Sequence, residues 1–176
     1  MTTRPAPLAP IFGNIPSILT AQSNWVMWCY MLKDGKYTKV PKQPGGSNAS
    51  TTNPATWQTF DSVRTAYQRD TFDGVGIVLT GKPLDNGLYL IGLDFDHCLT
   101  DGMLDDAPRK AVVQLNTYCE ISPSGNGIRL FLLHDKPTTA KKINVDGKSR
   151  EIYSTGRYLT VTGHAIGQPK EVRHVA

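Results

Sequence analysis

An apolar run that ends in two closely spaced acids is the feature that most constrains this chain. Residues 88–93 are followed by Asp94, Phe95 and Asp96. In a β-strand, residues two apart point to the same face, so a strand ending here turns both carboxylates one way and Phe95 into a core. Adjacent carboxylates repel each other, and Mg²⁺ or Mn²⁺, which prefer oxygen ligands, relieve that repulsion. The pattern predicts a divalent-metal site; the plain alternative is a strand end with two solvated acids.

Length and composition fit one globular domain. The 176 residues, 39% of them hydrophobic, suffice for one core, so we expect an extended, proline-rich arm over residues 1–20 and a single domain over residues 21–176. The net charge of +4 permits a nucleic-acid partner without requiring one. Three cysteines without C-x-x-C spacing indicate neither a disulfide framework nor a zinc site. We find no signal peptide and no apolar run of about 18 residues for a membrane span, and we expect a cytoplasmic protein.

Turn signals and periodicity predict an α+β fold. Asp34-Gly35 between two apolar runs is typical of a β-hairpin, and Asn53-Pro54 is typical of a helix start. We expect the strand at 74–80 to pair antiparallel with the acidic strand. The fold class is thus α+β with a mixed or antiparallel sheet, acids on one face and helices on the other. The predicted helices are 56–69 and 105–116, and the predicted strands include 24–32, 37–40, 74–80 and 128–133.

A loop of small residues precedes the strand at 128–133. Ser122, Ser124 and Gly125 could turn backbone N–H groups and hydroxyls toward one anion, although a tight hairpin turn fits the same residues. Arg129 is unusual in a largely apolar strand. A cation at that position indicates a phosphate or carboxylate partner.

A third informative stretch supplies another acid. Glu151 lies in a predicted short strand, 151–153, which a turn at 154–156 joins to an antiparallel partner at 157–162. An edge-strand glutamate paired with Arg150 or Arg157 is the ordinary alternative. A lysine-rich connector precedes this strand.

Taken in order, these stretches resemble the archaeo-eukaryotic primase superfamily, in particular the bifunctional primase-polymerase domains of phage and plasmid replication proteins. The motifs are Leu93-Asp-Phe-Asp96, Ser122-Pro-Ser-Gly-Asn-Gly-Ile-Arg129 and Arg150-Glu-Ile-Tyr153, and the similarity extends over roughly residues 24–164. It implies a catalytic core similar to the RNA-recognition fold and a template-dependent DNA polymerase or primase that acts in DNA replication. Many relatives carry histidine where this chain has Arg129.

The resemblance also implies roles for individual residues. Asp94, Asp96 and Glu151 would hold Mg²⁺ or Mn²⁺ for transfer of a nucleotide from a dNTP or NTP to a primer 3′-hydroxyl. The residues expected to bind the nucleotide are Ser122, Ser124, Gly125, Arg129, Arg157 and Tyr158. The residues expected to bind single-stranded template and primer are Lys42, Lys141, Lys142 and Lys148. A C-terminal helical domain or a helicase is an expected partner.

Two other functions compete with this one. The segment Leu93-Asp-Phe-Asp-His-Cys-Leu-Thr-Asp-Gly102 looks like the nucleophile motif of haloacid-dehalogenase-like phosphohydrolases, in which Asp94 would form an aspartyl phosphate. About 90 residues precede it here, and no later acidic pair follows a strand. The other competitor is a replication initiator or single-stranded-DNA-binding module that has kept the fold and lost the chemistry, which Arg129 favours and three intact acids oppose.

Overall fold

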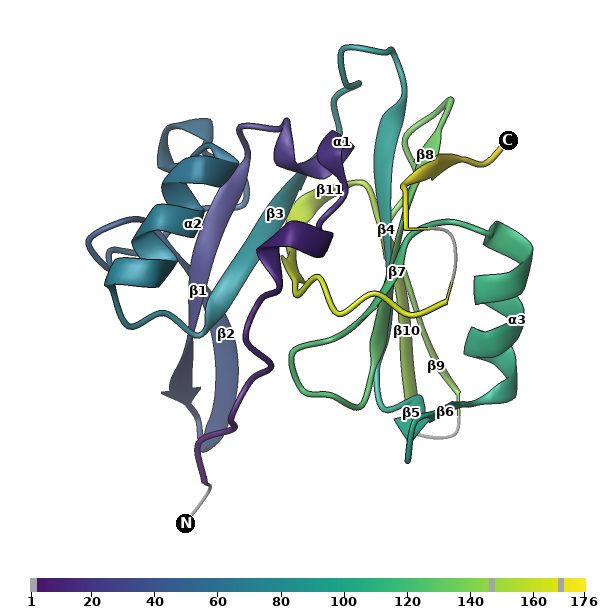
Figure 1. Cartoon of the computed structure of the whole chain (residues 1–176), viewed down its shortest axis with the longest axis horizontal. Helices are drawn as coiled ribbons and strands as arrows, with labels where there is room; N and C mark the ends of the chain where they lie inside the picture. Colours follow the sequence, from purple (N-terminus) through teal and green to yellow (C-terminus); the bar gives the residue numbers. More distant parts are fainter. Residues whose placement is uncertain (1–2, 146–147, 168–169) are drawn as a thin grey trace.

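The computed structural model describes residues 3–145, 148–167 and 170–176, which form two main sheets, a small hairpin and short helices (Figure 1). The first sheet contains β1 (Trp25–Lys33), β2 (Lys36–Lys42), β3 (Gly74–Thr80) and β11 (Thr155–Val161). The second contains β4 (Tyr89–Phe95), β7 (Cys119–Ile121), β8 (Ile128–His134), β9 (Lys141–Val145), β10 (Lys148–Tyr153) and β12 (Arg173–His174). The small hairpin is β5 (Leu99–Thr100) with β6 (Met103–Leu104). The helices are α1 (Ser17–Thr20), α2 (Phe60–Arg69) and α3 (Asp106–Leu115), with 3₁₀ turns η1 (Phe12–Asn14) and η2 (Pro54–Thr56).

Strand order separates the two sheets. The first runs β11-β3-β1-β2, and the second runs β12-β8-β4-β10-β9 with β7 beside β8. The described neighbours are antiparallel except β12, which runs parallel to β8. The α+β prediction with mostly antiparallel strands is therefore confirmed, but the strands form two sheets rather than the single sheet that we expected. None of the helices in the described ranges is both long and apolar enough to span a membrane.

The predicted first hairpin is confirmed. β1 and β2 pair in register up to Lys33 and Lys36, which leaves Asp34 and Gly35 as a two-residue turn. Both have positive φ, 49° and 75°, as a type I′ turn requires, and this is why Asp-Gly is favoured there.

Two predicted strand pairings are wrong. β3 does not pair with β4, because its two edges are taken by β1 and β11. β10 does not form a hairpin with β11, because only Ser154 separates them and a tight antiparallel reversal needs about two residues. The chain instead passes at Ser154 from the second sheet into the first.

The predicted helix over residues 56–69 is also wrong at its start. Asn53 caps the short turn η2, and the chain then extends before α2 begins after a second cap, Thr59. The interruption has a visible cause: Gln58 exchanges two backbone hydrogen bonds with Trp25 at 2.8 and 3.0 Å. This antiparallel bridge to the first residue of β1 thus satisfies backbone groups that a continuous helix would have used. The second predicted helix is confirmed as α3.

Alternate residues of β4 face two different cores. Leu90 packs in the larger core with Ile77 and Leu159 of the first sheet. Phe95 packs on the opposite face with Leu130, beneath α3. Phe95 therefore points into a core, as predicted, and the face that carries Asp94 is turned toward the first sheet.

The N-terminal segment contacts both halves of the fold. It pairs Arg4 with Asp73 at 2.6 Å, and the Leu8 and Ile11 amides donate to Pro123 and Thr162. Farther on, the segment is not simply extended: it includes η1 and α1 and buries Ile15 and Leu19 in the larger core. It therefore ties the two halves of the fold together (Figure 1).

Replacing Gly163 with alanine should destabilise the fold by about 2 to 4 kcal/mol. Its φ is +68°, and an added Cβ would overlap the Ile11 carbonyl oxygen, a backbone atom of the N-terminal segment. Gly87→Ala is the matched control, because Gly87 has φ +80° but open space around its Cβ direction. Denaturant unfolding should show the larger loss for Gly163→Ala. Equal losses would mean that the contact with Ile11 contributes nothing.

Candidate active site

Five charged residues lie side by side across the second sheet. The strand register places Lys142 opposite Glu151, Glu151 opposite Asp94, Asp94 opposite Arg129 and Arg129 opposite Glu120. Directly paired residues share a face, so we call these five the charged row. Its signs alternate except at its centre, where Asp94 and Glu151 are neighbours.

Arg129 is the buried cation of the charged row. Its side chain is 5% exposed, Nη2 donates to Asp94 Oδ2 at 3.3 Å, and Nη1 donates to the carbonyl and hydroxyl of Thr160. Although burial acts in the opposite direction, Asp94 and Glu120 raise the pKa of Arg129. The guanidinium therefore remains charged and binds Asp94 from below the surface.

Glu151 is held by three donors. Lys142 forms an ion pair with it, Ser149 Oγ donates at 2.9 Å and Tyr153 Oη donates at 2.6 Å. Burial alone would raise the pKa of Glu151, but these hydrogen bonds lower it overall. Its carboxylate is thus kept ionised beside Asp94.

Glu120 ends the charged row inside the protein. It accepts hydrogen bonds from Tyr118 Oη at 2.8 Å and from the amides of Thr162 and Gly163 at 3.0 and 2.9 Å. Burial raises its pKa. Glu120 therefore joins β7 to the end of β11 and lies on the other side of Arg129 from Asp94.

Asp96 was expected to lie in the same strand as Asp94. It lies instead in the turn that follows β4, which ends at Phe95. Its amide donates to the Ser149 carbonyl at 3.0 Å, which keeps the turn beside β10. Burial and the charge of Asp94 raise the pKa of Asp96, while Arg129 and Lys39 lower it. Asp96 is thus within electrostatic reach of the charged row.

The small-residue loop 122–127 is the turn between β7 and β8. Ser122 and Ser124 hydroxyls lie 3.0 Å apart, Ser124 donates to Asn126 at 2.6 Å, and Asn126 contacts His97 at 3.1 Å. An added Cβ at Gly127 would lie 2.6 Å from the Phe95 carbonyl oxygen. The loop is therefore packed directly against the turn that carries Asp96.

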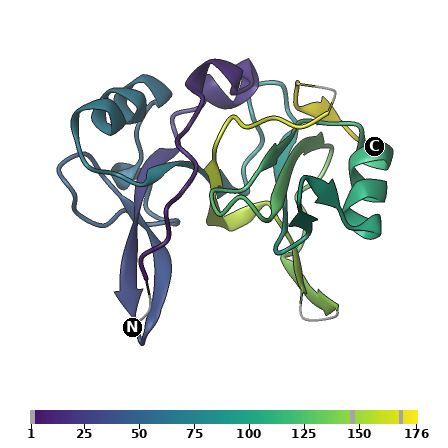
Figure 2. The ribbon, with the colours of Figure 1, turned by 60° about the horizontal axis from the view of Figure 1, so that its bottom comes forward.

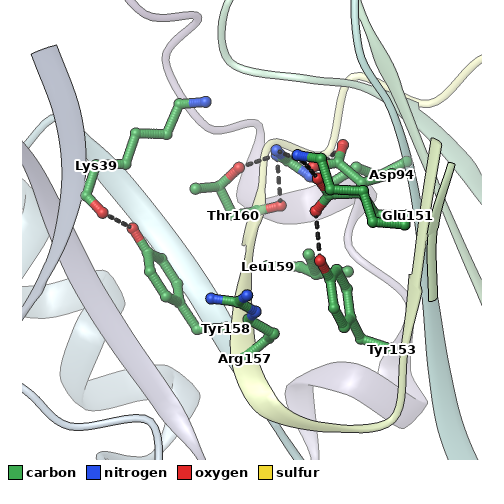
Figure 3. A pocket seen from close by; sticks show the side chains of 10 residues that line it. Lys39, Asp94, Glu151, Tyr153, Arg157, Tyr158, Leu159 and Thr160 are labelled. Atoms are coloured by element: carbon green, nitrogen blue, oxygen red, sulfur yellow. Dashed lines mark hydrogen bonds and ion pairs between the residues drawn. The ribbon is translucent and has the colours of Figure 1, made fainter. Parts of the chain in front are cut away.

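A cleft of about 380 Å³ opens between the two sheets beside the charged row (Figure 3). One wall comes from the second sheet and the other from β2 and β11 of the first. The residues that line it are Lys39, Asp94, Arg129, Lys142, Glu151, Tyr153, Arg157, Tyr158, Leu159 and Thr160.

Tyr158 spans the first sheet. Its hydroxyl donates to the Lys39 carbonyl at 2.7 Å, although β11 and β2 are the two edges of that sheet. Gly76 makes room for this, because an added Cβ there would lie 2.8 Å from the Tyr158 ring. The glycine and the tyrosine together fix the position of Lys39 at the cleft.

The structure gathers some of the residues predicted from sequence and separates others. Asp94, Glu151, Arg129, Arg157, Tyr158 and Lys142 all line the cleft. Ser122 is buried, whereas Ser124 and Gly125 are exposed near the Asp96 turn. Lys42 lines a separate cavity of about 370 Å³ and donates to Asn48, and Lys148 pairs with Asp105 at 2.6 Å. Lys141 is exposed on β9.

Sequence reasoning missed Glu120. It noted Lys39 beside a loop that either carries a ligand contact or merely connects, but did not assign Lys39 to the site. The signal for Glu120 was available: a hairpin whose turn is residues 122–127 pairs position 120 with position 129. No comparable local signal existed for Lys39, because its place depends on how the two sheets meet.

The donor chemistry at the centre of the charged row suits a hard divalent cation. Asp94 and Glu151 present carboxylates from paired positions, and Asp94 Oδ1 is buried without a hydrogen bond, although Arg129 Nε lies 3.1 Å away. Within the described ranges, no three His, Cys, Asp or Glu side chains are gathered as a metal-holding group. The donor set therefore fits a metal by chemistry, with the acids now engaged by Arg129 and Lys142.

Comparison with known proteins gives one informative relative. Over 169 residues the chain is 30% identical to a protein named DNA Primase-polymerase from Nitratiruptor phage NrS-1. The alignment covers 92% of this chain but 22% of the relative's length. No protein-family model matches the chain. In sequence, nearly the whole chain is thus similar to a part of a phage primase-polymerase.

Proposed function

We propose that this chain is the nucleotidyl-transfer core of a template-dependent DNA primase-polymerase. The observation that carries the proposal is the pairing of Asp94 with Glu151 at the edge of a cleft that also contains positive side chains. The similarity to a phage DNA primase-polymerase over nearly the full chain supports it. The substrates would be a primer on single-stranded template and a dNTP or NTP.

In this proposal Asp94, Asp96 and Glu151 hold Mg²⁺ or Mn²⁺. When bound, the metal lowers the cost of charge that develops on the attacking and leaving oxygens. The protein's own contribution is placement: β4 and β10 set Asp94 beside Glu151, while Ser149 and Tyr153 orient the Glu151 carboxylate. Arg129 orients Asp94 from below, and Glu120 offsets part of the buried positive charge of Arg129.

The loop residues Ser124 and Gly125 are exposed beside the Asp96 turn. A phosphate bound at this loop would therefore lie at the end of β4. Arg157 reaches the cleft from β11, where its guanidinium carbon lies 5.3 Å from the centre of the Tyr153 ring. Because its positive charge lies in the cleft, we propose that Arg157 binds the phosphates of the nucleotide.

Two basic hairpins project on the same side of the molecule, as Figure 2 shows. β9 and β10 carry Lys141, Lys142 and Lys148, and the β1–β2 hairpin carries exposed Lys33 and Lys36 near its turn. We propose that they hold the phosphates of template and primer on either side of the cleft.

Replacing Lys141 with alanine should weaken single-stranded DNA binding about two- to fivefold and reduce the slope of log K against log salt by about 0.7. Fluorescence anisotropy with a labelled oligonucleotide over a salt series measures both. Lys82→Ala is the control, because Lys82 is exposed and belongs to the segment that joins β3 to β4. That segment lies at the opposite end of β4 from the β9–β10 hairpin (Figure 1). An identical salt slope in both variants would mean that the β9–β10 hairpin does not bind the DNA phosphates.

The phosphohydrolase alternative needs Asp94 as a nucleophile. A nucleophile must have an oxygen free to attack, whereas the Asp94 side chain is 14% exposed and bound to Arg129. This geometry disfavours an aspartyl phosphate. Hydrolysis of a small aryl phosphate in Mg²⁺ would reverse that conclusion.

A non-catalytic DNA-binding module is the second candidate function. The observation that favours it is that Asp94 and Glu151 are already paired with Arg129 and Lys142. Extension of a labelled primer on single-stranded template, with dNTPs or NTPs and either Mg²⁺ or Mn²⁺, separates the two candidates. Elongation supports the nucleotidyl transferase; DNA binding without elongation under any metal supports the module.

A further inference from the structure

The two walls of the cleft differ in charge. Both carboxylates that line it, Asp94 and Glu151, come from the second sheet, and each is paired with a cation of that same sheet. Among the described lining residues, the cations left without a carboxylate partner within 4.0 Å are Lys39 and Arg157, both from the first sheet. The wall from the second sheet thus carries carboxylates that are paired with cations of the same sheet. The wall from the first sheet carries positive charges without carboxylate partners among the described residues.

Lys39 is placed on that wall by its backbone. Its carbonyl accepts the Tyr158 hydroxyl, and its position opposite Tyr30 in the β1–β2 register sets the face from which its side chain leaves. The side chain extends from β2 into the cleft, toward the Thr160 and Asp94 side (Figure 3). No described residue accepts a hydrogen bond from the Lys39 amine or forms an ion pair with it.

Charged groups of both signs act on the Lys39 amine. Burial and Arg129 lower the pKa of Lys39, while Asp94 and Asp96 raise it. Lys39 is only partly exposed, and a partly buried ammonium without a partner is stabilised by an anionic ligand.

We propose that Lys39 binds the triphosphate of the incoming nucleotide, opposite the acids and together with Arg157. This inference rests on the proposed function and adds the residue that distinguishes a nucleoside triphosphate from a monophosphate. A triphosphate spanning the cleft would place its reacting phosphate near Asp94 and Glu151 and its distal phosphates on the Lys39 wall. Arg129 is unsuited to that role, because its donors already serve Thr160 and Asp94 from a buried position.

Three variants test the assignment. Lys39→Met keeps the aliphatic stem and the backbone carbonyl that Tyr158 uses, but removes the charge. Lys39→Arg returns a positive charge. Lys82→Met is the control, because Lys82 is exposed in the segment that joins β3 to β4 and is not among the residues that line the cleft.

The expected result for Lys39→Met is a KM for dNTP that rises about 10- to 100-fold, with kcat changed by less than about threefold. Lys39→Arg should recover part of the loss, and Lys82→Met should match the wild type. A KM for Lys39→Met within about twofold of wild type, in a protein that extends primers, would overturn the assignment.

A binding measurement gives an independent readout. Displacement of a fluorescent dATP analogue by dATP and by dAMP, without primer, should show that Lys39→Met loses affinity for dATP and keeps its affinity for dAMP. Equal losses for both ligands would overturn the triphosphate role. If the wild type extends no primer, the proposed function fails, and the dATP-against-dAMP comparison still decides whether Lys39 reads distal phosphates.

Discussion

Asp94→Asn is expected to lower primer extension by about 10³-fold or more, because the substitution removes a carboxylate from the centre of the proposed metal site. The change is nearly isosteric, so the side chain should still fit between Arg129 and Glu151. Single-turnover extension of a labelled primer, under saturating Mg²⁺ or Mn²⁺, measures the effect.

Because Asp94 also balances a buried guanidinium, its loss affects stability as well as chemistry. Glu151→Gln separates the two effects, since its partner Lys142 has a side chain that is 55% exposed and can turn to water. We expect the same loss of extension with little loss of stability. Asp85→Asn, at an exposed position, serves as control. Full primer extension by both Asp94→Asn and Glu151→Gln would mean that the charged row does not take part in catalysis.

Arg129→Met is expected to destabilise the fold by about 3 to 5 kcal/mol, because it leaves Asp94 and fully buried Glu120 without their shared cation. Methionine keeps most of the side-chain length, so the loss reflects charge and hydrogen bonding rather than a large cavity. Urea unfolding followed by circular dichroism measures it.

The double variant Asp94→Asn with Arg129→Met tests whether the cost comes from the pair. Removing both charges should recover about 1 kcal/mol or more relative to the sum of the single variants. Additive losses, or a loss below about 1 kcal/mol for Arg129→Met alone, would mean that the buried ion pair does not hold the site together.

Local signals in the sequence predicted the local structure of the chain well. The Asp34-Gly35 turn, the strand that delivers Asp94 and helix α3 all follow from residues close together in the chain. The side of β4 that carries the acid followed from simple alternation, since Phe95 lies in the core beneath α3. These features depend on backbone propensity and on one buried face.

Pairing between distant strands could not be predicted in the same way. Sequence neighbours were expected to pair, yet β3 pairs with β1 and β11, and β10 joins β4 in the other sheet. That arrangement creates the cleft, so Lys39 could not be assigned to the site from its surroundings in sequence. The closeness of the sheets depends on single positions such as Gly92, where an added Cβ would overlap the Leu159 side chain.

The role of Arg129 shows the same limit. An arginine in an apolar strand indicated an anionic partner, and the structure supplies one from within the protein, Asp94. The register between β4 and β8, which could not be predicted from the sequence alone, places Arg129 opposite Asp94, so its partner is a carboxylate of the site.

Incorporation of a single nucleotide opposite each of the four template bases shows whether this chain is a template-dependent nucleotidyl transferase. The wild-type protein, a primer one base short of the test position and one labelled dNTP or NTP at a time suffice. A template-dependent nucleotidyl transferase should add only the nucleotide complementary to the template base, and Glu151→Gln should lose that addition. Addition that ignores the template base, or no addition in either metal while the protein still binds single-stranded DNA, would contradict the proposed function.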